Sequence, residues 1–169
     1  MPYALGTLTS DMLQLTKRTE YGLIALVHMV DQAGTFVSAR EISEHYAVPR
    51  RLLAEVLKDL CRGSLVSSQR GAAGGYTLSR DAEAITVGDV VEALEGAPTL
   101  AGCESTTTAG EPTSGDCDLE PQCPIRSPLH RLRESIWRQM QATSLVALTA
   151  PPTPMVQPRL PDLSENAAS

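Results

Sequence analysis

The chain has 169 residues, of which 42 % are hydrophobic and 4 % aromatic, and its formal net charge is −6 at pH 7. This length and hydrophobic content indicate one folded domain of ordinary size and exclude disorder of the whole chain. The sequence contains no apolar run of membrane-spanning length and no N-terminal secretory signal, so we expect a cytoplasmic protein. In a reducing compartment, clustered cysteines are metal ligands or redox groups more often than disulfides.

The charge is distributed unevenly. Residues 1–80 carry a net charge of +2, whereas residues 81–169 carry −8. This asymmetry places the basic surface in the N-terminal half, where a DNA footprint could form, although so small an excess is also typical of any solvated domain.

Residues 1–12 have the pattern of an irregular N-terminal extension. The run from Thr19 to Val30 is apolar on most of its circumference and predicts a buried helix that stops near Gly34. His28 lies within this run, and we expect a hydrogen-bonded core histidine there.

A tight turn then joins two further helices. Ser38 and Glu41 show the capping-box pattern before a short helix that runs to about Tyr46. Pro49 begins the next helix, expected over about residues 49–62 with Gly63 as its stop. The second helix is amphipathic and basic, which is the helix-turn-helix pattern. Its apolar face carries Leu53, Val56, Leu57 and Leu60, and its other side carries Arg50, Arg51, Glu55, Lys58 and Arg62.

A Gly-rich turn separates two strand-like runs directly after this pair of helices. The runs are 65–69 and 76–78, and the turn is Arg70-Gly71-Ala72-Ala73-Gly74-Gly75. This pattern predicts a β-hairpin, which after a helix-turn-helix is a wing. Residues 13–82 are therefore predicted to form a winged helix-turn-helix DNA-binding region.

The C-terminal half divides into four segments. Thr86 and Gly96 bound a connecting helix within residues 83–96, and residues 97–126 form a cysteine-containing loop. Ser127-Pro128 opens a long helix over residues 127–149, and residues 150–169 are a proline-rich tail expected to be disordered. The fold class is mainly α with a small hairpin. A narrow apolar stripe on the long helix suggests a homodimer seam, made of Leu129, Leu132, Ile136 and Met140.

Three cysteines, Cys103, Cys117 and Cys123, lie in or beside the polar loop, where thiols have little packing role. Thiolates in such a loop suit an iron–sulfur cluster (2Fe–2S or 4Fe–4S), the first choice here, or zinc or a thiol switch. Zinc is disfavoured because no Cys-x2-Cys pair is present, and vestigial cysteines are a further alternative. Cys61 lies on the basic helix and is expected to be buried and inert.

These features together resemble the Rrf-two family of iron–sulfur winged-helix transcription regulators, typified by IscR and NsrR. The resemblance covers about residues 13–148. It rests on the segment 15–22 (Leu-Thr-Lys-Arg-Thr-Glu-Tyr-Gly), the turn with Pro49, the wing sequence 70–76 and Cys117-x5-Cys123-Pro124-Ile125. It implies a homodimer that binds palindromic promoter DNA, dimerises through the long C-terminal helix and holds an iron–sulfur cluster on the three loop cysteines.

The chain departs from the family pattern in three ways. The gaps between the cysteines are uneven, thirteen residues and then five, and Arg126 stands where some members have a histidine ligand. Glu20 matches the position from which some relatives supply a carboxylate ligand across the dimer, so it is a candidate fourth ligand. The alternative is that its carboxylate only interacts favourably with the helix dipole at the N-terminus of its helix. Family chains begin near Met12, so residues 1–11 are an extension or an alternative start.

The expected function is a DNA-binding transcription regulator, commonly a repressor, controlled by a cluster that senses redox state, nitric oxide or iron supply. The alternatives are a zinc- or thiol-switch winged-helix regulator and a protein-interaction module without DNA binding. The sequence shows no phosphate-binding loop, nucleophile elbow or His-rich metal pattern, so we expect no enzyme. Lys58 and Arg62 have Glu55 and Asp59 as alternative partners on the same helix. The candidate DNA-binding residues are Arg50, Arg51, Lys58, Arg70, Gly71, Lys17 and Arg18.

Overall fold

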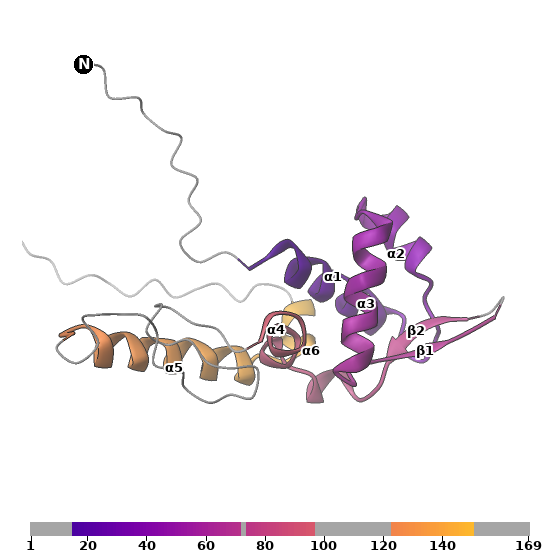
Figure 1. The fold of residues 1–169 in the computed structure, drawn as a ribbon. Coiled ribbons are helices and arrows are strands. Elements are labelled where there is room, and N and C mark those ends of the chain that lie inside the picture. The colour runs from indigo at the N-terminus through magenta and orange to yellow at the C-terminus, as the bar shows by residue number, and fades with distance from the viewer. Residues whose placement is uncertain (1–14, 72–73, 97–122, 151–169) are drawn as a thin grey trace, which may run out of the picture.

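The computed structural model describes residues 15–71, 74–96 and 123–150. Within them the chain is mainly helical with one antiparallel hairpin, as predicted, and Figure 1 shows α5 and the hairpin extending to opposite sides. In this described part no helix is long and apolar enough to cross a membrane. The elements are α1 (Lys17–Asp31), α2 (Ala39–Tyr46), α3 (Arg50–Arg62), β1 (Val66–Gln69), β2 (Gly75–Leu78), the 3-10 turn η1 (Ala82–Ala84), α4 (Val87–Glu95), α5 (Arg126–Ala142) and α6 (Leu145–Thr149).

The core forms around α1, which packs against α3, α4 and α6. Leu26 of α1, Leu57 of α3, Val90 of α4 and Leu145 of α6 are all fully buried. Burying one such aliphatic side chain stabilises a fold by roughly 1.5–3 kcal/mol. The winged helix, α4 and α6 therefore share one apolar core, so a shift at α4 acts on the same core that supports α3.

Helix capping matches the sequence prediction at α4 and partly at α2. Thr86 and Asp89 form a complete capping box at the start of α4. At α2, Ser38 accepts a hydrogen bond from the Glu41 amide, but the Glu41 carboxylate lies near His28 instead of accepting the predicted bond from the Ser38 amide. The Glu41 carboxylate lies 3.6 Å from Nε2 of His28.

His28 is buried, as expected for a core histidine. Its Nδ1 lies 3.3 Å from the hydroxyl oxygen of Tyr46. Its Nε2 has no hydrogen-bond partner among the described residues. The prediction of burial is therefore confirmed. The prediction that both ring nitrogens are hydrogen-bonded holds for Nδ1 but not for Nε2.

In the winged helix-turn-helix two helix starts differ from prediction, whereas α3 ends at Arg62 with Gly63 as its C-cap, as predicted. Helix α1 begins at Lys17 rather than Thr19 because the Thr16 side chain caps it, and Pro49 is the N-cap of α3 rather than its first residue. Gly63 has φ −75°, so the left-handed residue after α3 is Ser64, with φ 57°. A Cβ at Gly63 would lie 2.9 Å from the Cβ of Ala93, so this glycine permits close packing of α3 on α4.

The long C-terminal helix predicted over residues 127–149 is two helices. Helix α5 begins at Arg126 and ends at Ala142, and the extended Thr143 and the N-cap Ser144 separate it from α6. The interruption is caused by backbone pairing with distant residues: the Val87 amide donates to the Thr143 carbonyl, and the Leu145 amide donates to the Ile85 carbonyl. Ser127 does not cap α5, whose N-cap is Ile125.

Several predictions fall on residues outside the described part. These are the extension 1–12, the cysteines at 103 and 117 with the segment 97–122, and the tail from residue 151 onward.

Candidate DNA-binding surface and cysteine segment

Helices α2 and α3 are joined by the predicted helix-turn-helix turn. Ala47 adopts the left-handed conformation with φ 54°, and the buried Val48 fixes the turn to the core. The Ser43 hydroxyl donates to the Val48 carbonyl at 2.7 Å, and the Ser43 carbonyl accepts from the Val48 amide. These bonds hold the start of α3 at a fixed place relative to α2.

The first turn of α3 presents two arginines to solvent. Arg50 and Arg51 are both exposed, and the Arg51 side chain is 96 % exposed with its Nε 3.7 Å from Glu55. Two cations at a helix N-terminus oppose the helix dipole, so the dipole does not explain their placement. A DNA phosphate or a guanine edge is the partner that such residues take in helix-turn-helix proteins.

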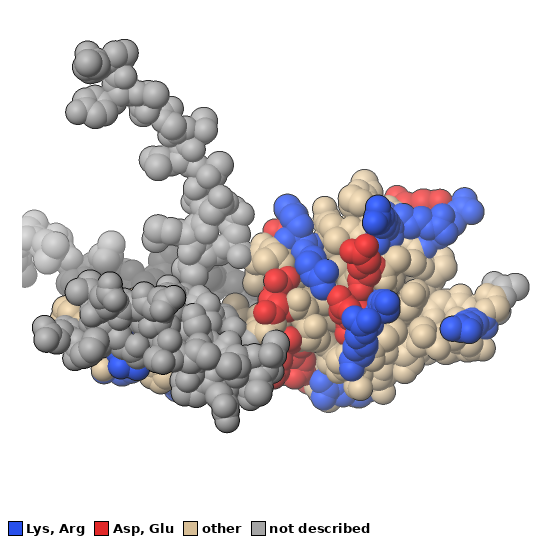
Figure 2. Space-filling view, in the orientation of Figure 1, with Lys and Arg blue, Asp and Glu red and all other residues tan. Residues whose placement is uncertain are grey.

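The wing carries the predicted arginine at its tip. Strands β1 and β2 pair in register from Val66 with Leu78 to Gln69 with Gly75, and the exposed Arg70 follows β1. Gly71 has φ +119°, which an L side chain rarely adopts. Figure 2 shows Lys and Arg side chains over α2, α3 and the wing, interleaved with acidic ones.

The remaining basic candidates are placed differently from one another. Lys58 is exposed on α3, and Lys17 pairs with Glu20 at 2.5 Å. Arg18 is turned toward the protein, because its guanidinium Nη2 lies 2.6 Å from Asp59 and its Nε lies 3.9 Å from Glu95. Of the six basic candidate residues, Arg18 is therefore the one whose charge is turned most toward the protein.

Asp59 is held by two arginines. It accepts from Arg18 and from Arg62, the latter at 2.7 Å, which is the pairing along the helix considered from the sequence. The hydrogen bond from the Arg18 guanidinium, helped by Arg62, holds the pKa of the Asp59 carboxyl below its usual range. No local sequence pattern predicts the contact with Arg18, since the two residues lie on different helices.

Cys123 is the loop cysteine that the structure describes. It is a half-buried free thiol directly before α5. Cys103 and Cys117 lie outside the described residues. Among the residues that the structure describes, no three His, Cys, Asp or Glu side chains are grouped so that they could hold a metal ion. The candidate ligand Glu20 stands in the first turn of α1 and pairs with Lys17. Three thiolates with one carboxylate are nevertheless a donor set that suits an iron–sulfur cluster.

Cys61 is half-buried, rather than fully buried as expected. It packs against the core on α3, and burial raises the pKa of its thiol, with a hydrogen bond to Ser68 acting in the opposite direction. A neutral thiol is a poor ligand and a poor nucleophile.

The predicted dimer face of α5 is only partly covered by the rest of the described chain, because Leu129, Ile136 and Met140 are half-buried and Leu132 is exposed. No residue of α5, all of which is described, is buried. Leu132 is 51 % exposed, and Ile125 just before the helix is 57 % exposed. The four stripe residues Leu129, Leu132, Ile136 and Met140 all lie on this helix, before the break at Thr143.

Solved structures of bacterial regulators share this fold. A transcriptional regulator of Listeria innocua matches with 25 % identity, covering 87 % of this chain and 94 % of its own, at a TM-score of 0.65. The oxidised form of Staphylococcus aureus CymR matches with 25 % identity, covering 83 % and 99 %, at a TM-score of 0.63. IscR of T. potens matches with 23 % identity, covering 83 % and 88 %, at a TM-score of 0.61.

The family comparison covers most of the chain. Residues 15–151 match the family model described as Rrf2, iron-dependent transcriptional regulator. This span includes the winged helix, the cysteine segment and both C-terminal helices. The chain therefore belongs to the Rrf2 family, whose members are winged-helix DNA-binding transcription regulators and not enzymes.

Proposed function

We propose that this chain acts as a homodimer that binds palindromic promoter DNA and represses transcription under the control of an iron–sulfur cluster. The observation that supports DNA reading is the pair of exposed arginines at the start of α3, together with the exposed arginine of the wing. In this proposal Arg50 and Arg51 meet base edges or phosphates, Lys58 and Lys17 add phosphate contacts, and Arg70 with Gly71 approaches the backbone from the wing.

The cluster would be held by Cys103, Cys117 and Cys123, with Glu20 from the partner subunit as the candidate fourth ligand. When bound, it supplies a group that gains or loses electrons or reacts with nitric oxide. The segment 97–122 joins α4 to the residues before α5, and α4 packs on α1 and α3. A conformational change of the segment would thus alter the spacing of the two recognition helices in the dimer. Binding to half-sites one helical turn apart requires a fixed spacing of these helices.

Dimerisation in this proposal uses α5. Its stripe is only partly covered, with Leu132 51 % exposed, which supports a two-fold seam with a second copy. The same helix follows Cys123 directly, so the dimer seam and the cysteine segment are adjacent in the chain.

A thiol switch is the second candidate. It is supported by the half-buried free thiol of Cys123 and by the likeness to CymR, a protein solved in an oxidised form. In that case the cysteines would change state by oxidation, without iron.

Anaerobic purification, followed by measurement of the visible absorbance and of the iron and sulfide content, distinguishes cluster control from a thiol switch. We expect a coloured protein with inorganic sulfide, and Cys117→Ala should remove the visible absorbance and change affinity for a duplex that wild type selects from a random library. A colourless protein whose DNA affinity changes reversibly with thiol oxidation would establish the switch instead. Duplex binding without salt dependence would contradict the DNA-reading proposal itself.

A further inference from the structure

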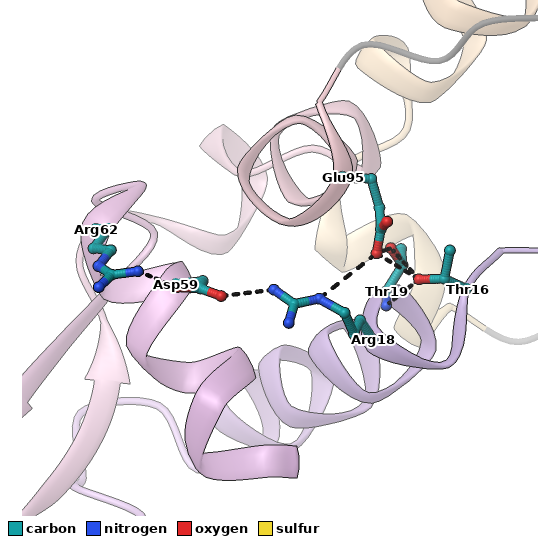
Figure 3. Close-up of polar contacts among 6 residues, drawn as sticks. All are labelled: Thr16, Arg18, Thr19, Asp59, Arg62 and Glu95. Atoms are coloured by element: carbon teal, nitrogen blue, oxygen red, sulfur yellow. Dashed lines mark hydrogen bonds and ion pairs between the residues drawn. The ribbon is translucent and has the colours of Figure 1, made fainter. Parts of the chain in front are cut away.

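Three helices of the described chain meet at one arginine, and Figure 3 shows the contacts. The Nη2 of Arg18, in the first turn of α1, lies 2.6 Å from Oδ2 of Asp59 on α3. Its Nε lies 3.9 Å from Oε1 of Glu95 at the end of α4. We call this set of Arg18, Asp59 and Glu95 the Arg18 bridge.

The same Glu95 oxygen also holds the start of α1. The hydroxyl of Thr16 donates to it at 2.5 Å, and the hydroxyl of Thr19 is 3.4 Å away. Thr16 is the N-cap of α1 and accepts from the Thr19 amide. One carboxylate of α4 is therefore in contact with both the cap and the arginine of α1.

The two carboxylates of the Arg18 bridge lie next to the cysteine segment and on the recognition helix. Glu95 is the last residue of α4, and only Gly96, with φ +83°, separates it from the segment 97–122 that carries Cys103 and Cys117. Asp59 lies on α3 one turn before its end. The bridge thus joins the residue nearest the cysteine segment to the helix that carries Arg50 and Arg51.

Partial burial makes these contacts stronger than ordinary surface pairs. The side chains of Arg18, Asp59 and Glu95 are 36 %, 21 % and 31 % exposed, whereas the surface pair Arg40–Glu44 is 69 % and 64 % exposed. Reduced solvent screening strengthens the attraction, and the fixed fork of a guanidinium can address two carboxylates from different nitrogens. A displacement of Glu95 would change the negative charge near the Arg18 guanidinium. The strength of the ion pair between Arg18 and Asp59 would then change as well.

We propose that Arg18 is a positioning residue that couples the end of α4 to the recognition helix α3, so that the state of the cysteine segment reaches the DNA-reading arginines through the Arg18 bridge. This inference rests on the proposed cofactor control and names a route for it. Arg18 acts through Asp59 and Glu95 and makes no direct contact with DNA.

The test compares DNA affinity in two states of one protein. Dissociation constants for the selected duplex are measured by fluorescence anisotropy with cluster-loaded and cluster-free protein, and their ratio is the coupling. Allosteric couplings are typically 5–150-fold. Arg18→Ala should keep the visible absorbance per chain but bring this ratio to within about twofold of one, and Arg18→Lys should restore part of it.

The matched control is Arg80→Ala. Arg80 also pairs with α4, its Nη2 being 3.0 Å from Asp89, but Asp89 lies in the first turn of that helix, at the opposite end from Glu95. This variant should keep the wild-type ratio. If Arg18→Ala does not fold, Glu95→Gln carries the test, because a glutamine oxygen still accepts from Thr16 while its charge toward Arg18 is lost.

The outcomes are distinguishable. A wild-type ratio in Arg18→Ala or Glu95→Gln would overturn the bridge while leaving cofactor control intact. Equal weakening of both states would instead make Arg18 a direct DNA contact or a purely structural residue. A wild-type protein whose affinity is the same in both states would overturn cofactor control, and the bridge with it.

Discussion

The backbone amide of Leu145 donates a hydrogen bond to the carbonyl oxygen of Ile85 at 2.9 Å, and both side chains are fully buried. This contact, with the neighbouring one from Val87 to Thr143, ends α5 and returns the chain to the core. The projecting α5 is thus anchored at its C-terminal end to the domain that contains α3.

Leu145→Ala should lower the free energy of unfolding by about 2–5 kcal/mol, because it removes a fully buried side chain and leaves a cavity. Urea unfolding followed by circular dichroism measures this change. Leu148→Ala, at a residue 42 % exposed in the same helix, is the control and should cost far less. Equal losses in the two variants would contradict the placement of α6 against α1.

The double substitution Arg50→Ala with Arg51→Ala should weaken binding to the selected duplex by about 1–3 kcal/mol and reduce the salt dependence of binding. The reason is that both arginines are exposed at the start of α3. Anisotropy titrations between low and high salt measure both quantities. Arg131→Ala removes an exposed arginine of α5 and should leave both unchanged; a loss as large as that of the double variant would indicate a nonspecific charge effect.

Asp59→Asn should change how stability depends on pH. The Arg18 contact, with Arg62, holds the pKa of Asp59 below its usual range, so its ionised form stabilises the fold above the ordinary pKa of an aspartate, about 4. That stability is lost as pH falls through the lower folded-state pKa. The variant should therefore be less stable than wild type at pH 7, and the gap should narrow below about pH 4. Unfolding curves at several pH values check this, and a constant gap would argue against the ion pair.

Cys61→Ser should leave the visible absorbance and iron content of anaerobically purified protein unchanged, whereas Cys123→Ala should abolish both. Cys61 packs on the core and burial raises the pKa of its thiol, so it is not a ready thiolate ligand. Cys123 stands half-buried before α5. Loss of colour in the Cys61 variant, with its fold intact by circular dichroism, would place the cofactor elsewhere.

Gly88→Ala should destabilise the packing of α4 on α5 by about 1–3 kcal/mol. A Cβ at Gly88 would lie 2.8 Å from Cγ of Gln141 and 3.1 Å from its Cα, and the backbone cannot move aside as a side chain can. Thermal unfolding measures the loss. Glu92→Ala, at an exposed residue of the same helix, should be close to neutral, and a neutral Gly88→Ala would contradict the close approach.

The sequence predicted the helix-turn-helix, the wing and the start of α4 at Thr86 because each depends on residues close together in the chain. Ser38 with the Glu41 amide, or Thr86 with Asp89, is decided within one helical turn. The positions of Arg50, Arg51 and Arg70 follow from these elements, so the exposed basic surface could also be anticipated.

Tertiary structure alone decided the break at Thr143 and the role of Arg18. The apolar stripe of α5 continues past Thr143 without any stop signal, and the helix ends there because its backbone pairs with residues 85–87. Arg18 has the same exposed, helix-start pattern in sequence as Lys17, yet only Arg18 lies within reach of Asp59 and Glu95. Contacts between residues tens of positions apart leave no periodic or spacing signal in a single sequence, because they depend on how whole helices pack on a shared core.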